Sequence, residues 1–436
     1  MTRGSDPAGP VYGIDFGTWT SAAVVLRRGH PPLPVRDPVS PYGATSVRSA
    51  VCVLPDGSVV VGQAAQNSRL QRPDRFRAEF KREFGEPSPL QLGERRYTAA
   101  QLTAKVLGFL VEQAGSAVNA APSRVVITVP ATWEGNRREL MLSAAEAAGL
   151  PREIVEVHTE PVAAIVYALQ DHGMDRDRTI LVYDLGGGTF DLAVAQGTKE
   201  GFTVLGSPGG LSDVGGLAID EAVLGLIRER CPDTVDALRR SAAGSDDPTA
   251  LRRAILLAEA CTMFKQQLSV SSEHSDLLTM LDPPIEVTLT RTDLREAIRP
   301  LLSETVEECE RVLRAHRLDW NDIDLIVPVG GSSRLPMVAD LLYERSGRTV
   351  LNVAEPELAV AVGAAWLARG IAPQQVATAP PDPRSASPSI TDSPPTPKSS
   401  APLPPPPSHL PHKVAALLRA GLSDRMVREA VRHVRH

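Results

Sequence analysis

The sequence has few cysteines, few aromatic residues, no excess of positive charge and no long apolar run. The four cysteines among 436 residues lie far apart without a Cys-x-x-Cys pair, so we expect buried side chains and no metal ligands. The formal net charge of −6 argues against nucleic acid as the main partner. No segment approaches the roughly 18 apolar residues that cross a bilayer. The N-terminus lacks the apolar stretch of a signal peptide, and we therefore expect a cytoplasmic protein.

The length and the apolar pattern predict a two-lobed α/β domain over residues 11–370. Hydrophobic residues make up 42% of the chain, enough to build a core. Apolar runs of strand length alternate with amphipathic helical stretches, which is typical of α/β folds. Strands are expected at 12–14, 21–26, 124–129, 179–183, 192–196 and 325–329. Helices are expected at 99–114, 137–148, 161–169, 218–228, 251–268, 295–314 and 336–346.

Both ends of the chain differ from this central part. Residues 1–10 are predicted to be a disordered tail, and residues 371–411, with 14 of the 38 prolines, a disordered linker. Residues 412–436 have apolar side chains at roughly helical spacing and six basic against two acidic residues. This pattern predicts a basic amphipathic helical tail that contacts a protein partner, the acidic body of the chain or, least expected, a membrane surface.

A motif that occurs twice in the chain, an internal echo of eight residues, carries most of the functional information. The stretch VYGIDFGT at 11–18 recurs as VYDLGGGT at 182–189, and each copy is followed by a second apolar strand. Each copy is therefore predicted to be a β-hairpin with a glycine-containing turn, and two such hairpins imply two related lobes. Glycine lets backbone N–H groups approach phosphate oxygens, and an adjacent threonine hydroxyl adds a donor.

The acidic residues of the two hairpins, Asp15 and Asp184, suit magnesium, which prefers oxygen ligands and usually keeps several waters. Facing each other, the hairpins would grip one triphosphate from both sides. A third glycine-rich turn, residues 330–336, follows the strand at 325–329. There backbone N–H groups and the planar guanidinium of Arg334 are suited to a nucleotide base.

At these motifs the sequence resembles the ATPase domain of the seventy-kilodalton heat-shock protein (DnaK-type chaperone) family, within the superfamily of actin and the sugar kinases. Residues 183–191 are similar to its second phosphate loop, 13–18 to its first, and 329–336 to its adenosine loop. Further similar stretches are 127–131, 160–164 and 359–365. The resemblance covers residues 11–370 and implies a two-lobed actin-like (ribonuclease H-like) ATPase fold with the nucleotide in a central cleft.

The resemblance also implies roles for individual residues. It implies that Asp15 and Asp184 hold Mg²⁺ through water, and that Lys81, Glu160, Asp184 and Thr189 serve hydrolysis. The pair Pro130 and Arg138 is similar to one that relays the nucleotide state between lobes. The implied ATP/ADP-binding residues are Gly17, Thr18, Gly186, Gly187, Gly188, Gly215, Gly216, Lys265, Ser269, Gly330, Gly331, Ser332, Arg334 and Glu357.

Several residues depart from the family pattern. Trp19 replaces a small hydroxyl residue beside the first phosphate loop, and Thr262 stands where a ribose-binding glutamate is expected. Glu357 replaces an aspartate near the adenine side, and Leu217 and Ala218 replace two acids. After residue 370, neither the family's leucine-rich linker nor its peptide-binding β-sandwich and lid is evident in the sequence.

We therefore expect a Mg²⁺-dependent ATPase of slow turnover that switches a protein partner through a lobe surface or the basic tail. The alternative is a non-catalytic ATP-sensing scaffold or an actin-like assembling protein. A third hypothesis, a sugar or small-molecule kinase, needs a substrate base for which Glu160 and Asp184 are the only candidates.

Overall fold

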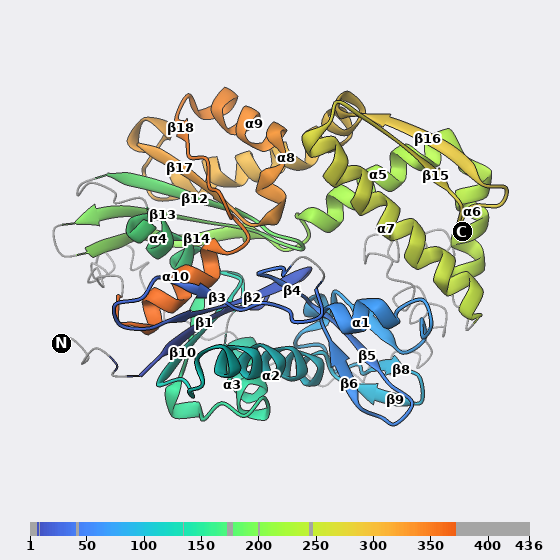
Figure 1. The fold of residues 1–436 in the computed structure, drawn as a ribbon. Helices are drawn as coiled ribbons and strands as arrows, with labels where there is room; N and C mark the ends of the chain where they lie inside the picture. The colour runs from blue at the N-terminus through green and yellow to red at the C-terminus, as the bar shows by residue number, and fades with distance from the viewer. Residues whose placement is uncertain are drawn as a thin grey trace, which may run out of the picture.

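A computed structural model describes residues 7, 9–40, 43–133, 135–171, 178–198, 201–243 and 247–371. Two lobes lie one above the other in Figure 1, each built around a mixed β-sheet. The predicted two-lobed α/β fold is confirmed. Of the linker predicted at 371–411 and the helical tail predicted at 412–436, all but residue 371 lies outside the described residues, as do residues 1–6 and 8.

The first sheet has the strand order β11-β10-β1-β2-β3, with β4 also pairing with β2. Its strands are β1 (Val11–Asp15), β2 (Thr20–Leu26), β3 (Leu33–Pro34), β4 (Val47–Arg48), β10 (Arg124–Val129) and β11 (Val155–Thr159).

The second sheet repeats this arrangement in the order β14-β13-β12-β17-β18. Its strands are β12 (Thr179–Leu185), β13 (Phe190–Thr198), β14 (Gly201–Leu211), β17 (Leu325–Val329) and β18 (Thr349–Val350). In each lobe the first hairpin is antiparallel (β1–β2, β12–β13) and its first strand pairs in parallel with the next strand (β10, β17). The two hairpins predicted from the internal echo are therefore confirmed.

Two helices, α4 (Glu160–Asp171) and α10 (Ala359–Ala368), pack between the two sheets. They form one hydrophobic core with residues of β1, β2, β12 and β17. The helices touch through their backbones: a Cβ added to Gly363 of α10 would lie 1.8 Å from the carbonyl oxygen of Ala163 in α4. Only a glycine permits this approach.

Other helices cover the outer faces. In the first lobe α2 (Ala99–Val118) and α3 (Asn136–Ala147) pack on the sheet, and α2 begins with a capping box formed by Thr98 and Gln101. In the second lobe α5 (Gly216–Arg230), α8 (Arg291–Ala315) and α9 (Pro336–Ser346) join a separate large core. None of the described helices is long and apolar enough to span a membrane.

Each lobe carries an outer part at the right of Figure 1. In the first lobe it contains β5 (Ala50–Val53), β6 (Val59–Val61), β7 (Phe76–Ala78), β8 (Leu90–Leu92), β9 (Arg95–Tyr97), α1 (Gln63–Ser68) and the 3₁₀ turn η1 (Phe80–Glu83). In the second lobe it contains α6 (Pro232–Ala242), α7 (Pro248–Val270), β15 (Glu273–Leu278) and β16 (Ile285–Thr290). Three further 3₁₀ turns are η2 (Arg152–Ile154), η3 (Trp320–Asp322) and η4 (Gly331–Arg334).

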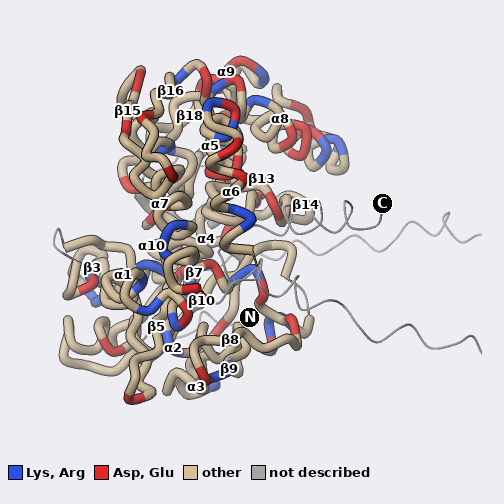
Figure 2. The backbone as a smooth tube through the Cα atoms, turned by 90° about the vertical axis from the view of Figure 1, so that its right-hand side faces the viewer, with Lys and Arg blue, Asp and Glu red and all other residues tan. Residues whose placement is uncertain are grey.

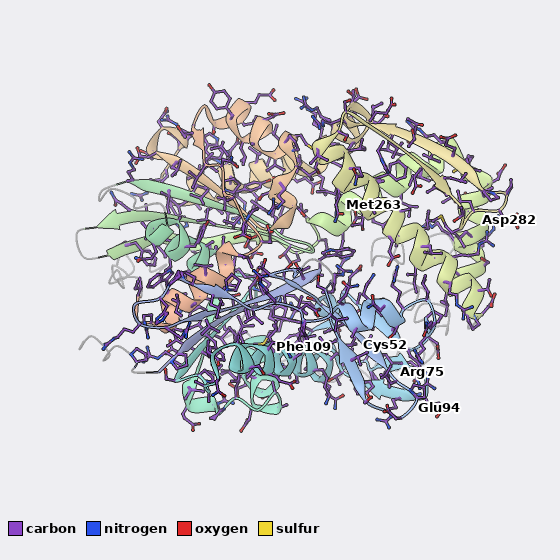
Figure 3. The ribbon with its side chains drawn as sticks, in the orientation of Figure 1. Cys52, Arg75, Glu94, Phe109, Met263 and Asp282 are labelled. Carbon is purple, nitrogen blue, oxygen red and sulfur yellow. The ribbon has the colours of Figure 1, made fainter. Side chains whose placement is uncertain are left out.

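Acidic and basic residues are interspersed along both lobes (Figure 2), and side chains of both lobes extend into the space between the ribbons (Figure 3). In Figure 3 Met263 marks α7 in the second lobe, and Cys52 marks β5 in the first. All four cysteines are free and buried, as predicted.

Candidate functional site

The turns of the two hairpins face each other across a central cavity of about 500 Å³ between the lobes. This size lies within the range of sites that bind small molecules and cofactors. The cavity brings together all but one of the residues that the resemblance assigns to hydrolysis, to Mg²⁺ and to nucleotide binding. They are Asp15, Gly17, Thr18, Lys81, Glu160, Asp184, Gly186, Gly187, Gly188, Thr189, Gly216, Lys265, Ser269, Gly330, Gly331, Ser332, Arg334 and Glu357. The exception, Gly215, packs behind the loop against the Gly188 backbone.

The two glycine-containing loops touch across this cavity. A Cβ added to Gly188 would lie 2.6 Å from the hydroxyl oxygen of Thr18 in the other lobe. The second loop is fixed from behind, because Gly186 accepts hydrogen bonds from the Gly216 N–H (2.9 Å) and from the Ser332 hydroxyl (2.9 Å). The loops therefore hold a defined separation that any larger residue at position 188 would change.

A buried cluster of charged side chains lies at the inner end of the cavity. The Lys81 ammonium from η1 lies 2.7 Å from the Glu160 carboxylate at the start of α4, and both side chains are more than nine-tenths buried. Asp15 ends β1 and accepts a hydrogen bond from the Thr128 hydroxyl at 2.9 Å, and Asp184 lies on β12. The four side chains thus come from both lobes.

The negative charge of this cluster exceeds what one lysine neutralises. Burial, followed by the charge of Glu160, raises the pKa of Asp15 to about 7 and that of Asp184 well above its usual range. Burial lowers the pKa of Lys81, but Glu160 and Asp15 outweigh it and the net shift is upward. The cluster is therefore built to accept a further cation.

The donor set fits Mg²⁺ held partly through water and phosphate oxygens. Among the described residues no group of three or more acidic, histidine or cysteine side chains is arranged to enclose a metal ion. Magnesium sites that use one or two carboxylates together with substrate phosphates need no such enclosure. Asp15 and Asp184, on facing hairpins, would hold the ion there, and its charge would offset the burial and the repulsion that raise their pKa values.

The side of the cavity at α7 contains the residues implied to bind adenosine. The Lys265 ammonium lies 2.9 Å from Asp220 and donates to the Gly216 carbonyl oxygen at 3.0 Å. Thr262 donates to the same Asp220 carboxylate at 3.2 Å. The Ser269 hydroxyl donates to the Lys265 carbonyl oxygen of its own helix. Lys265 is therefore held by the second lobe itself.

Arg334 and Glu357 form an ion pair at the rim of the cavity. The guanidinium donates to both carboxylate oxygens at 2.7 Å and to the Ala354 carbonyl oxygen at 3.3 Å. Arg334 lies at the end of η4, the turn that precedes α9. Its planar group is thereby fixed in one orientation, which suits stacking on a base.

Pro130 and Arg138 flank a turn beneath the cluster. The Trp133 N–H donates to the Pro130 carbonyl oxygen, and Arg138 donates to the Trp133 carbonyl oxygen at 3.2 Å. The Trp133 ring stacks on Phe84 with centroids 4.6 Å apart, and its centroid lies 5.6 Å from the Lys81 ammonium. The turn thus supports Lys81 from the side.

Sequence reasoning assigned no role to Asp191 or Asp220, although both belong to this region. The Asp191 carboxylate accepts the Ala131 N–H at 2.8 Å and a hydrogen bond from Thr189. Burial and Glu160 raise the Asp191 pKa to about 7. Asp191 follows Thr189 by two residues in the second loop, and that short spacing is the signal by which it could have been found.

A comparison with protein families agrees with this geometry. The family model described as "Hsp70 protein" matches residues 88–378, two-thirds of the chain. The match includes the second phosphate loop, Glu160 and the turn at 330–336.

Proposed function

This chain belongs to the Hsp70 family, and we propose that it binds ATP with Mg²⁺, hydrolyses it slowly and thereby switches a protein partner. The observation that carries the proposal is the Lys81–Glu160 pair at 2.7 Å, placed with Asp15 and Asp184 beside two facing glycine-rich loops. In this arrangement, groups that can donate hydrogen bonds to phosphate line the same cavity as carboxylates that can bind a cation and a water molecule.

The residues of the cluster have separable tasks in hydrolysis. Backbone N–H groups of the two loops and the hydroxyls of Thr18 and Thr189 would donate to phosphate oxygens. Glu160 would hold Lys81 and orient a water molecule, and the Lys81 ammonium would stabilise charge on the γ-phosphate. The water oxygen bonds to the γ-phosphorus while the bond to the β,γ-bridging oxygen breaks, giving ADP, phosphate and a proton. Asp15 and Asp184 would hold Mg²⁺, which would supply positive charge to offset that of the phosphate groups.

The test is single-turnover hydrolysis of ATP by the full chain and by Lys81→Ala. We expect the variant to lose hydrolysis by at least about 100-fold, as for other single electrostatic stabilisers, and to keep ATP binding. The matched control is Lys105→Ala, which changes an exposed lysine on α2. Equal rates in all three proteins, or loss of ATP binding in Lys81→Ala alone, would contradict the role of Lys81.

The proposed switch rests on contacts between the outer parts of the lobes. Arg69, after α1, forms a bidentate ion pair with Glu259 of α7, and Arg252 donates to the Leu70 carbonyl oxygen at 2.6 Å. These contacts join the outer parts of the two lobes. We expect release of the nucleotide to require them to separate. Hydrogen exchange of α1 and α7 in ATP and ADP should differ, and identical exchange in both states would refute the switch.

A second candidate is ATP sensing without turnover, favoured by the position of Trp19. This bulky residue takes the place of a small hydroxyl beside the first loop, and its ring lies 6.0 Å from the Lys265 ammonium. Tight ATP binding without Lys81-dependent hydrolysis would select this function. Sedimentation that depends on ATP would select the related actin-like assembly.

A further inference from the structure

A second cavity, of about 130 Å³, lies between the outer parts of the two lobes and shares Trp19 as a wall with the central cavity. One side is formed by the first lobe, from β4 to the turn η1. The other side is formed by α5, α6 and α7, whose apolar side chains include Leu224, Leu238 and Ile255. None of the residues assigned to ATP hydrolysis lines this cavity.

Arg48, on the first-lobe side, is a guanidinium without an ionic partner. It lies over the Trp19 ring, 3.3 Å from the centroid, and donates to the Trp19 carbonyl oxygen at 3.0 Å. In the described part of the chain it forms no ion pair and no other side-chain hydrogen bond. Burial lowers the pKa of Arg48 to about 10, as expected for a charge removed from water.

Glu79, which also lines the first-lobe side of this cavity, is a carboxylate without an ionic partner in the described residues. Within the described ranges it makes neither a hydrogen bond nor an ion pair, and its interaction with Arg48 acts only at longer range. Burial raises the pKa of Glu79 to about 7 although Arg48 and Arg77 oppose this. Its backbone has φ of 63°, an unusual conformation for a residue other than glycine, and such strain is concentrated at functional sites.

The remaining charged side chains around this cavity already interact with other groups. Arg77 pairs with Glu83, Arg82 with Asp213, Asp220 with Lys265 and Glu259 with Arg69, and Glu221 and Arg239 also have partners. The cavity therefore presents one unpaired positive and one unpaired negative group beside an apolar wall. Both side chains are half-buried, and a ligand with a single charge would pair with only one of them.

We propose that this second cavity binds a free α-amino acid with an aliphatic side chain. The ligand carboxylate accepts hydrogen bonds from Arg48, its ammonium donates to Glu79, and its side chain packs against Leu224, Leu238 and Ile255. Charge and polarity thus point to the same class of ligand.

The bound amino acid would act on the nucleotide site through two short connections. Glu79 precedes Lys81 by two residues and caps the turn that carries it. Trp19 follows Thr18 and lies against Gly187, since a Cβ added to Gly187 would be 2.7 Å from the Trp19 Cβ. This regulatory effect rests on the proposed function, whereas binding itself does not.

The test is calorimetric titration of the full chain, without nucleotide, using L-leucine and two analogues. Isopentylamine lacks the carboxylate and 4-methylpentanoate lacks the ammonium. We expect saturable binding of one leucine and at least about tenfold weaker binding of both analogues, since each loses a charge-assisted hydrogen bond. Absence of saturable leucine binding, or equal binding of leucine and isopentylamine, would overturn the proposal.

Variants assign the binding to this cavity. Glu79→Gln should weaken leucine binding at least about tenfold and leave 4-methylpentanoate unaffected. The control Glu86→Gln, at an exposed position of the same segment, should bind leucine as the unmodified chain does. Ala254→Leu, which fills the apolar side, should abolish binding of all three ligands. Unchanged leucine binding by a folded Glu79→Gln protein would refute the site, irrespective of whether the chain hydrolyses ATP.

Discussion

Replacement of Asp15 by asparagine should make the nucleotide-free protein more stable at alkaline pH. The Asp15 pKa is about 7 in the folded protein against an ordinary value of 3.8. Between these values the folded state binds the proton more tightly than the unfolded state, so the stability that Asp15 contributes falls as pH rises. Asparagine has no charge to bury and still accepts the hydrogen bond from Thr128.

The magnitude follows from the size of the pKa shift. At pH 8 ionisation of Asp15 costs about 4 kcal/mol of folding free energy, and at pH 5 only about 2 kcal/mol. The gain of Asp15→Asn should therefore grow by about 2 to 3 kcal/mol from pH 5 to pH 8. For lobes of this size that corresponds to about 5–10 °C in Tm.

The assay is thermal unfolding of both proteins at pH 5 and pH 8, without Mg²⁺ or nucleotide. Asp56→Asn is a control of opposite sign, because hydrogen bonds from Ser58 lower the pKa of the exposed Asp56 carboxylate. That variant should lose stability at both pH values by the same small amount. An equal gain for Asp15→Asn at pH 5 and pH 8 would refute the view that Asp15 is destabilised by burial.

Two further changes test how the lobes meet. Glu259→Ala removes the ion pair with Arg69 between the outer parts of the lobes and should speed ADP release by about 2- to 10-fold, measured by stopped-flow displacement of a fluorescent analogue. An unchanged rate would show that this contact does not hold the lobes together. Gly188→Ala places a methyl group 2.6 Å from the Thr18 hydroxyl and should weaken ATP binding at least about tenfold, measured by equilibrium dialysis. The control Gly225→Ala, with open space around it, should bind ATP as the unmodified chain does. Equal ATP affinities of the two variants would argue against contact between the loops.

The sequence predicted the two sheets and most of the site because their signals are local. The strand preceding Asp15 and the strand preceding the glycine run at 186–188 are apolar stretches ended by turn residues. These signals depend on neighbouring residues only. Tertiary structure then brought the predicted loops together without changing their local form.

Elements without such signals were missed. Nine of the ten residues of α10 are buried, so it has no polar face and no 3.6-residue period to detect. In the hairpin of β15 and β16, β15 is mostly exposed and its sequence lacks a strand pattern. The alternation of apolar and polar residues in β16 is a strand signal that we overlooked in the sequence. The second cavity joins residues from 19 to 262, and no spacing in the sequence indicates that Arg48 and Glu79 face one space.

The contact between α4 and α10 has a consequence for how the molecule opens. Because small residues bring the two backbones together, these helices have little freedom to separate or slide. We therefore expect opening to be a rotation about this pair as an axis, with the largest displacement in the outer parts of the lobes, where Arg69 meets Glu259. The described residues end at Ile371, three residues after α10. A segment attached there starts close to the axis, so opening of the lobes would rotate it more than displace it.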